Sequence, residues 1–189
     1  MDRLIYPLDY SLTCFYGLWL FVSILGLEEN YLKTEEIKSR FCFYVRFSDL
    51  FHGLSLNNQD LSGCTIQGRL TSWQLHNVNF SYSLFPHMRL INCDIINSNF
   101  ECCTFFFFKS EASLFSKCSF HQATLEFMQA GVVKFMQVNF KEAVIKNIYC
   151  KHGSTVFYDC DFSHSKIDPD ALAVLENIYP GVKKGRRNG

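Results

Sequence analysis

A large apolar residue recurs at every fifth position through most of this chain, and this spacing restricts the folds open to it more than any other feature. An α-helix presents the same face every 3.6 residues and a β-strand every second residue, so neither accounts for a period of five. The chain must instead turn a corner after each short extended segment. The uninterrupted part of the series has its large apolar centres at Leu70, Leu75, Phe80, Phe85, Leu90, Ile95, Phe100, Phe105, Phe115, Phe120, Leu125, Phe135, Phe140 and Ile145.

The series extends in both directions after small shifts in register. It begins at Phe51, is one residue short at Leu70, and resumes two residues late at Phe157. The position two residues before each centre is small in most repeats, as at Val78, Ser98 and Cys118, so we expect both positions to point inward. These small positions are Cys64, Val78, Ser83, Cys93, Ser98, Cys103, Ser113, Cys118, Ala123, Val133, Val138, Ala143, Thr155, Cys160 and Ser165.

A second period of twenty residues predicts four faces in each turn of the chain. The centres at residues 110, 130 and 150 shrink to Ser, Ala and Cys, while the inward residues two positions earlier, Phe108, Met128 and Ile148, are unusually large. Because protein interiors are close-packed, volume lost at one inward site must be supplied at another. The same period spaces Phe80, Phe100, Phe120 and Phe140, with Phe162 following after the two-residue shift.

The repeated pentads resemble the A(D/N)LXX repeats of the pentapeptide-repeat family over about residues 51 to 167. The copies that carry the resemblance are QDLSG at 59 to 63, VNFSY at 78 to 82, CDIIN at 93 to 97, SNFEC at 98 to 102, VNFKE at 138 to 142 and CDFSH at 160 to 164. The resemblance implies an all-β solenoid, a right-handed quadrilateral β-helix in which the centre and the small residue both point inward. This chain departs from the family pattern in its frequent Phe at the centre and in Cys, Ser or Val where Ala is usual.

We expect three segments along the chain. Residues 1–40 form a hydrophobic segment and linker, 41–167 the β-helix, and 168–189 a capping helix with a basic tail. The stretch from Tyr10 to Leu27 has no charged residue and admits two interpretations: a membrane anchor, since about 20 apolar residues span a bilayer, or a helix that caps the open end of the solenoid. If it spans, Lys33, Lys38 and Arg40 favour a cytoplasmic β-helix. Asp168 is the expected N-cap of the C-terminal helix, with Pro169 at its first position.

Composition and motifs give no sign of an enzyme or of a bound cofactor or metal. The nine cysteines are odd in number and scattered, which favours free thiols in a reducing compartment over a disulfide framework. The six histidines show no metal-ligand spacing, and neither a nucleophile elbow nor a phosphate-binding glycine loop is present in the sequence. Cys93, Cys103, Cys118 and Cys160 occupy inward sites, whereas Cys102 is expected to point outward.

Two outward surfaces are candidates for binding a partner. Stacked coils place Arg69, Arg89 and Lys109 in one ladder, and adjacent like charges are unfavourable in a sheet. The ladder is either a binding site for an anionic group or a solvated face that prevents aggregation. The second surface consists of His87, Phe106, Phe107 and Phe127, and it is either a partner site or is covered by the N-terminal segment or by a second copy in a homodimer.

The sequence therefore predicts a non-enzymatic interaction or scaffold module with an unknown protein partner. Two settings are open: membrane association through Tyr10 to Leu27, or a cytoplasmic or secreted bacterial effector, as the resemblance allows. The resemblance also implies two alternatives, a topoisomerase-binding DNA mimic and the substrate-binding part of a ubiquitin-ligase effector. Nine acidic residues against nine basic ones between Phe51 and Asp168 argue against a DNA mimic, the chain has no recognisable ligase domain, and no nucleic-acid partner is expected.

Overall fold

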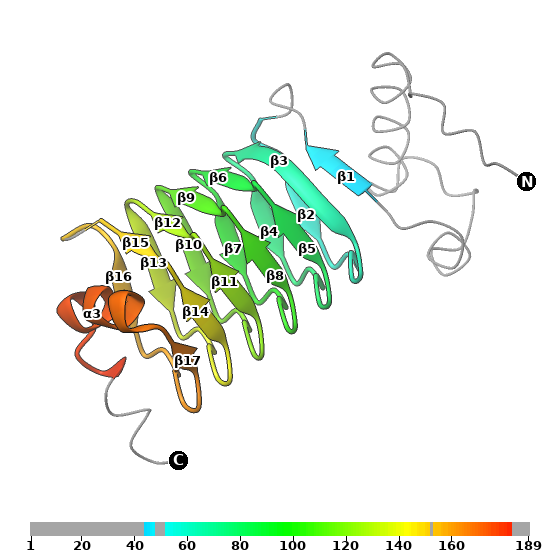
Figure 1. The fold of residues 1–189 in the computed structure, drawn as a ribbon. Coiled ribbons are helices and arrows are strands. Elements are labelled where there is room, and N and C mark those ends of the chain that lie inside the picture. The colour runs from blue at the N-terminus through cyan, green and yellow to red at the C-terminus, as the bar shows by residue number, and fades with distance from the viewer. Residues whose placement is uncertain (1–43, 48–51, 152, 183–189) are drawn as a thin grey trace, which may run out of the picture. The chain divides into compact units, whose positions relative to one another are not determined.

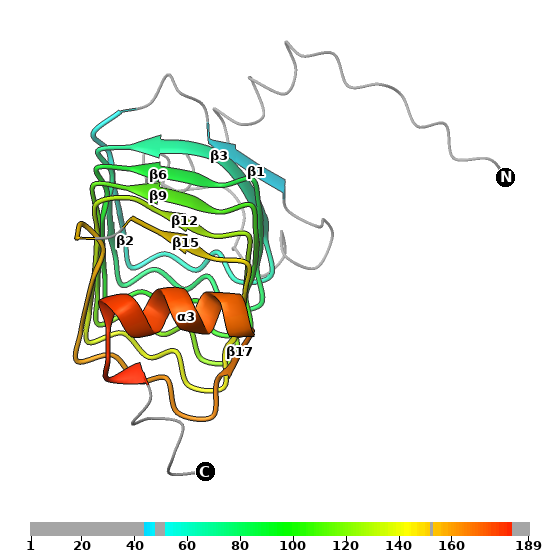
Figure 2. The same ribbon diagram turned by 60° about the vertical axis from the view of Figure 1, so that its left-hand side comes forward.

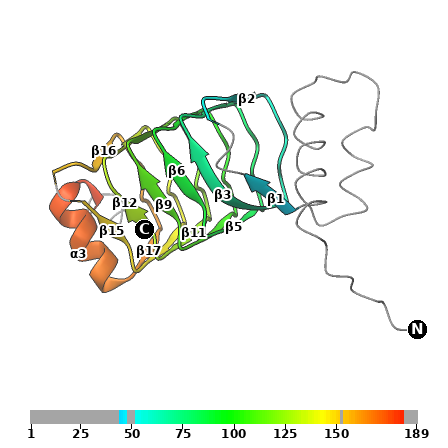
Figure 3. The same ribbon diagram turned by 90° about the horizontal axis from the view of Figure 1, so that it is seen from above.

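The computed structural model describes residues 44–47, 52–151 and 153–182, which wind into a solenoid of about six turns followed by one helix (Figure 1). Strand β1 (Tyr44–Phe47) lies at one end of the solenoid and helix α3 (Pro169–Ile178) at the other (Figure 3). The segment from Tyr10 to Leu27 lies outside the described residues, so its two interpretations stay open.

Each turn has four faces, which we name after their inward residues in the third turn: the Leu90, Ile95, Phe100 and Phe105 faces. Figure 2 shows the stacked turns nearly end-on. The Leu90 face contains the end of β3 (Thr65–Thr71), β6 (Arg89–Ile91), β9 (Lys109–Glu111), β12 (Gln129–Ala130) and β15 (Tyr149–Cys150). The Ile95 face contains β2 (Ser55–Asn57), β4 (Gln74–His76), β7 (Asp94–Ile96), β10 (Ser113–Ser116), β13 (Val133–Met136) and β16 (Val156–Tyr158). The Phe105 face contains β1, the start of β3, β5 (Leu84–Pro86), β8 (Thr104–Phe106), β11 (Thr124–Glu126), β14 (Val144–Lys146) and β17 (Lys166–Ile167).

The strand register confirms the predicted four-faced solenoid. All paired strands are parallel, and through the central turns each residue pairs with one twenty positions away, as Phe105 does with Leu125. The Phe100 face has isolated bridges in place of strands, which join Asp60, Asn79, Asn99, Ser119, Asn139 and Asp161 in order. A parallel pair needs a long connection, and here the other three sides of the turn provide it.

The one-residue shift at Leu70 explains why two faces form one continuous sheet. Four residues instead of five separate Ile66 from Leu70, and β3 runs through this corner without a break, so it pairs with β5 on one face and β6 on the next. Gly68 lies at the bend with a φ of 112°, a conformation that residues with a Cβ rarely adopt. The Leu90 and Phe105 faces are therefore joined as an 11-stranded sheet.

Most corners elsewhere place one residue in the left-handed region, two positions after the centre. Among the residues that the structure describes, eighteen other than glycine have a positive φ, between 49° and 61°, and they include Asn58, Asn77, Asn92 and Asn97. Asn tolerates this conformation better than most residues, because its side chain can hydrogen-bond to the nearby backbone. For residues without such a side chain the left-handed conformation costs about 1–2 kcal/mol of stability.

Ala112→Gly is expected to raise the free energy of unfolding by about 0.5–1 kcal/mol, because Ala112 has a φ of 49° and an exposed side chain. Ala123→Gly is the matched control, since Ala123 is buried and has no positive φ, and the same change there should destabilise. Urea unfolding of both variants measures the difference. Equal losses at the two sites would contradict the role assigned to the corner conformation.

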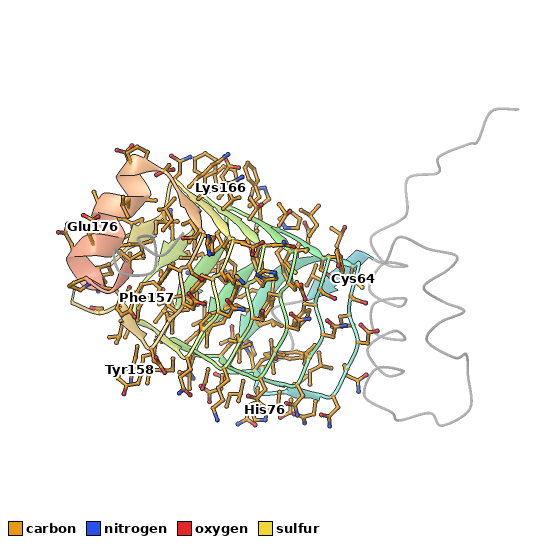
Figure 4. The ribbon with its side chains drawn as sticks, turned by 90° about the horizontal axis from the view of Figure 1, so that it is seen from below. Cys64, His76, Phe157, Tyr158, Lys166 and Glu176 are labelled. Carbon is orange, nitrogen blue, oxygen red and sulfur yellow. The ribbon has the colours of Figure 1, made fainter. Side chains whose placement is uncertain are left out.

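Inside the turns, the side chains form columns of stacked rings that run along the solenoid. Phe80, Phe100, Phe120, Phe140 and Phe162 stack with centroid separations of 4.8–5.3 Å. The predicted exchange of volume is confirmed, because Phe108, Met128 and Ile148 are buried beside the buried Ser110, Ala130 and Cys150. Of the predicted small inward positions, Cys160 alone is half-buried. Figure 4 shows Phe157 among the inward side chains near the α3 end, with Tyr158 on the outside.

Helix α3 covers the C-terminal end of this core. As predicted, Asp168 is its N-cap and accepts a hydrogen bond from the Ala171 amide at 2.6 Å. Ala171 and Leu175 are buried, and the ring of Tyr179 lies 6.0–6.2 Å from those of Phe157 and Phe162. The predicted apolar face is narrower than expected, since Leu172 and Ile178 are half-buried.

Candidate functional site

Four ring side chains gather on the corner between the Phe105 and Leu90 faces, and we call this surface the aromatic corner: His87, Phe106, Phe107 and Phe127. The rings of His87 and Phe107 stack at 5.1 Å and those of Phe107 and Phe127 at 4.9 Å. Phe106 packs edge-on against Phe107 at 4.4 Å. The predicted alignment is therefore present, and the three Phe side chains remain 36–45% exposed.

The backbone conformation at the aromatic corner is unfavourable for aromatic residues. His87, Phe107 and Phe127 all have a φ of 54°, and Asn147 occupies the equivalent position in the next turn with a φ of 50°. Gly and Asn suit this conformation, whereas each aromatic residue costs about 1–2 kcal/mol. The same conformation occurs at other corners with other residue types, such as Lys117, so the backbone alone does not set this corner apart. What distinguishes it is the row of exposed, stacked rings.

The predicted basic ladder lies on the Leu90 face directly after this corner. Arg69 pairs in register with Arg89, and Arg89 with Lys109. All three side chains are half-buried. Within the described residues, neither Arg89 nor Lys109 forms an ion pair, and the Nε of Arg89 is buried without a hydrogen-bond partner. A buried donor without a partner is costly, but this nitrogen is out of reach of solvent, so only the exposed part of the half-buried Arg89 side chain can meet a partner.

Positive and negative charges lie on different sides of the solenoid, although the net charge of residues 52–168 is zero. The Leu90 and Phe105 faces, each with the corner that follows it, carry six basic and three acidic residues: Arg69, Arg89, Lys109, Lys146, Lys151 and Lys166 against Glu111, Glu126 and Asp168. The Ile95 and Phe100 faces carry the reverse: Lys117, Lys134 and Lys141 against Asp60, Asp94, Glu101, Glu142, Asp159 and Asp161. Figure 4 shows Lys166 on one side and His76 with Tyr158 on the opposite side. The sequence alone did not reveal this separation, because it depends on assigning every residue to a face.

A period of twenty residues over four faces, with a left-handed residue at most corners, decides the architecture. The fold is the pentapeptide-repeat β-helix. The chain is similar in structure to a pentapeptide repeat protein from the Arabidopsis thaliana thylakoid lumen, with 16% identity, a TM-score of 0.28, and coverage of 68% of this chain and 79% of that one. It is also similar to QnrB1, a plasmid-mediated fluoroquinolone resistance protein, with 13% identity, a TM-score of 0.26, and coverage of 72% and 95%.

A third similar structure is HetL, a pentapeptide repeat protein involved in heterocyst differentiation regulation from the cyanobacterium Nostoc, with 11% identity, a TM-score of 0.25, and coverage of 70% and 81%. No protein-family model and no curated protein matches the chain. What can be said of this pentapeptide-repeat β-helix therefore rests on its own geometry.

The inward cysteines of the β-helix are held as protonated thiols. Burial raises the pKa of Cys103 and of Cys118 to about 12, and the pKa of Cys93 also rises. The thiol of Cys103 donates to the Phe80 carbonyl at 2.8 Å. Cys102, predicted to point outward, is half-buried, and its thiol lies 3.4 Å from Oε1 of Gln122.

Iodoacetamide at pH 8 is expected to modify Cys102 at least roughly 100 times faster than Cys103, because only thiolates react and a pKa of about 12 leaves very little thiolate. Site-resolved mass spectrometry of the folded chain measures both rates, and the two adjacent residues serve as controls for each other. Unfolding in urea should make the rates similar. Comparable rates in the folded state would show that Cys103 is not enclosed.

A polar cluster surrounds Cys102 on the corner between the Phe100 and Phe105 faces. Nε2 of Gln122 donates to Glu142 at 2.9 Å, and this hydrogen bond lowers the pKa of Glu142, with His121, Lys141 and His164 adding to the effect. No group of three His, Cys, Asp or Glu in the described part of the chain is arranged to hold a metal ion. Likewise, none of the described helices is long and apolar enough to cross a membrane.

Proposed function

We propose that this chain is a non-enzymatic protein-interaction module whose partner binds at the aromatic corner and the adjacent basic ladder. One observation carries the proposal: three successive turns keep the rings of His87, Phe107 and Phe127 exposed and stacked in one row on the outside of the solenoid. Aromatic residues and Arg are enriched in the binding hot spots of protein interfaces. The solenoid supports this role because it holds the outward side chains in a rigid array.

The DNA-mimic alternative requires a strongly negative surface. The negative side of the β-helix carries six acidic residues among three basic ones, which is a small excess for a duplex mimic. The ubiquitin-ligase alternative assigns substrate binding to the solenoid, so it is a special case of the interaction module. The DNA-mimic alternative does not use the aromatic corner, so the interaction module is the better account of the outward residues.

A photo-crosslinking residue at position 107 tests the proposal directly. We expect it to form one discrete adduct with a partner protein in cells that express the chain, and the adduct should disappear in the Arg89→Glu, Lys109→Glu variant. The same residue at position 158 is the matched control, because Tyr158 is 60% exposed but lies on the Ile95 face. An adduct at 158 and none at 107, or an adduct that survives the double variant, would overturn the proposal.

The proposal includes two cellular settings, a membrane-associated module and a secreted or cytoplasmic effector. The uncharged stretch from Tyr10 to Leu27 supports the first. Fractionation of the full chain and of a variant that lacks residues 10–27 distinguishes them. Loss of membrane association on deletion supports the anchor, whereas a full chain found in the soluble fraction supports the effector setting.

A further inference from the structure

The ring geometry of the aromatic corner restricts what can bind there. His87, Phe107 and Phe127 are nearly parallel, with interplanar angles of 8° and 17°, and their separations of 4.9–5.1 Å leave no space for another ring between them. Their faces are therefore occupied by each other, and the edges are what a partner meets. Ring edges carry positive partial charge, so they suit aliphatic groups and carboxylates and do not offer a stacking platform for nucleobases.

The spacing of the turns selects the secondary structure of the partner. An α-helix advances 5.4 Å per turn, which is within about 0.5 Å of the spacing between the rings. An extended strand repeats its side chains on one face every ~6.6 Å and would be out of step by about 1.6 Å at each turn of the solenoid. A helix that lies along the solenoid axis can therefore place one side chain against each of three successive turns.

The positive charge beside the corner favours a helix that carries negative charge. Arg89 and Lys109 follow His87 and Phe107 by two residues, so a cationic column runs parallel to the aromatic one. Both side chains are half-buried, and neither forms an ion pair within the described residues. Carboxylates on the flank of an incoming helix would pair with the exposed parts of these two cations and relieve the repulsion between like charges on adjacent strands.

We propose that the aromatic corner and the basic ladder bind an acidic amphipathic α-helix of a partner protein, oriented along the solenoid axis. Apolar side chains at i, i+4 and i+7 contact the edges of His87, Phe107 and Phe127, one in each of three successive turns. Acidic residues on one flank of the helix contact Arg89 and Lys109. This proposal rests on the proposed function and specifies the chemistry of its partner.

Three synthetic peptides of about 20 residues, long enough to span the corner as helices, test it by fluorescence anisotropy with the full chain. The first places Leu at i, i+4 and i+7 with Glu on the flanks. The second has the same composition in strict Leu–Glu alternation, and the third is the first with Lys for every Glu. We expect the first to bind roughly tenfold or more tightly than either of the others.

Variants of the chain locate that binding. Arg89→Glu with Lys109→Glu, and separately Phe107→Ser, should each weaken binding of the first peptide by roughly tenfold or more. Lys134→Glu and Tyr158→Ser, on the Ile95 face, are the matched controls and should leave it unchanged. Equal binding of the alternating peptide, or binding of the first peptide that none of the corner variants weakens, would overturn the acidic helix.

Two further outcomes separate this inference from the function on which it rests. A photo-adduct at position 107 without binding of the helical peptide would overturn the acidic helix and leave the interaction module standing. Sedimentation of the chain with phosphatidylcholine and phosphatidylserine vesicles that is lost in Phe107→Ser would also overturn it, by making the corner a contact for an anionic membrane. Retention of vesicle binding in that variant would assign the membrane contact to another part of the chain and support the inference.

Discussion

Phe120→Ala is expected to lower the free energy of unfolding by about 3–5 kcal/mol, the usual cost of deleting a fully buried ring. Phe120 is 2% exposed and stacks between Phe100 at 4.8 Å and Phe140 at 5.3 Å. It also contacts Phe105 and Phe115 from the neighbouring faces. The substitution would leave a cavity in the middle of the column, where the surrounding rings are fixed by their own turns and cannot collapse into it.

Urea unfolding followed by circular dichroism measures the loss. Tyr158→Ala is the matched control, because Tyr158 is 60% exposed and its removal should cost less than about 1 kcal/mol. Because each turn contacts only its neighbours, hydrogen exchange should show the amides of adjacent turns losing protection first. A loss below about 1 kcal/mol for Phe120→Ala would mean that the column does not act as the core of the solenoid.

The faces of the solenoid could be predicted because the sequence carries two nested periods. The centre residues and the small residues two positions earlier assign every side chain in the regular part to the inside or the outside. The alignment of His87, Phe107 and Phe127 follows from the twenty-residue period alone, and the structure places these rings within stacking distance. The position of Arg89 between Arg69 and Lys109 follows in the same way.

Other features depend on interactions in the folded chain that the periodicity of the sequence does not predict. The half-buried state of Cys160 arises in the last turn, where no further turn follows and α3 lies against β14 and β15 instead. The continuity of β3 depends on how Gly68 bends at a shortened corner. The strain at the aromatic corner and the unpartnered Nε of Arg89 are properties of backbone angles and burial, so they appear only in three dimensions.

Ser110→Leu and Phe108→Met form a double-mutant cycle in which each single change should destabilise and the pair should largely compensate. The double variant reproduces the pair Met88 and Leu90 found one turn earlier. Ser110→Leu alone adds volume beside a buried Phe and should cost about 1–3 kcal/mol, while Phe108→Met alone leaves a void and should cost roughly 1 kcal/mol.

The coupling energy between the two changes is expected to be at least about 1 kcal/mol in favour of the double variant. Urea unfolding of the four proteins measures it. Ser110→Ala is the control that removes the hydroxyl group without adding volume. It should be neutral or stabilising, because the Ser110 hydroxyl is buried with no hydrogen-bond partner. Strictly additive losses would mean that the two inward positions do not share one space, and the reciprocal sizes at residues 88 and 90, 108 and 110, 128 and 130, and 148 and 150 would then need a different cause from close packing.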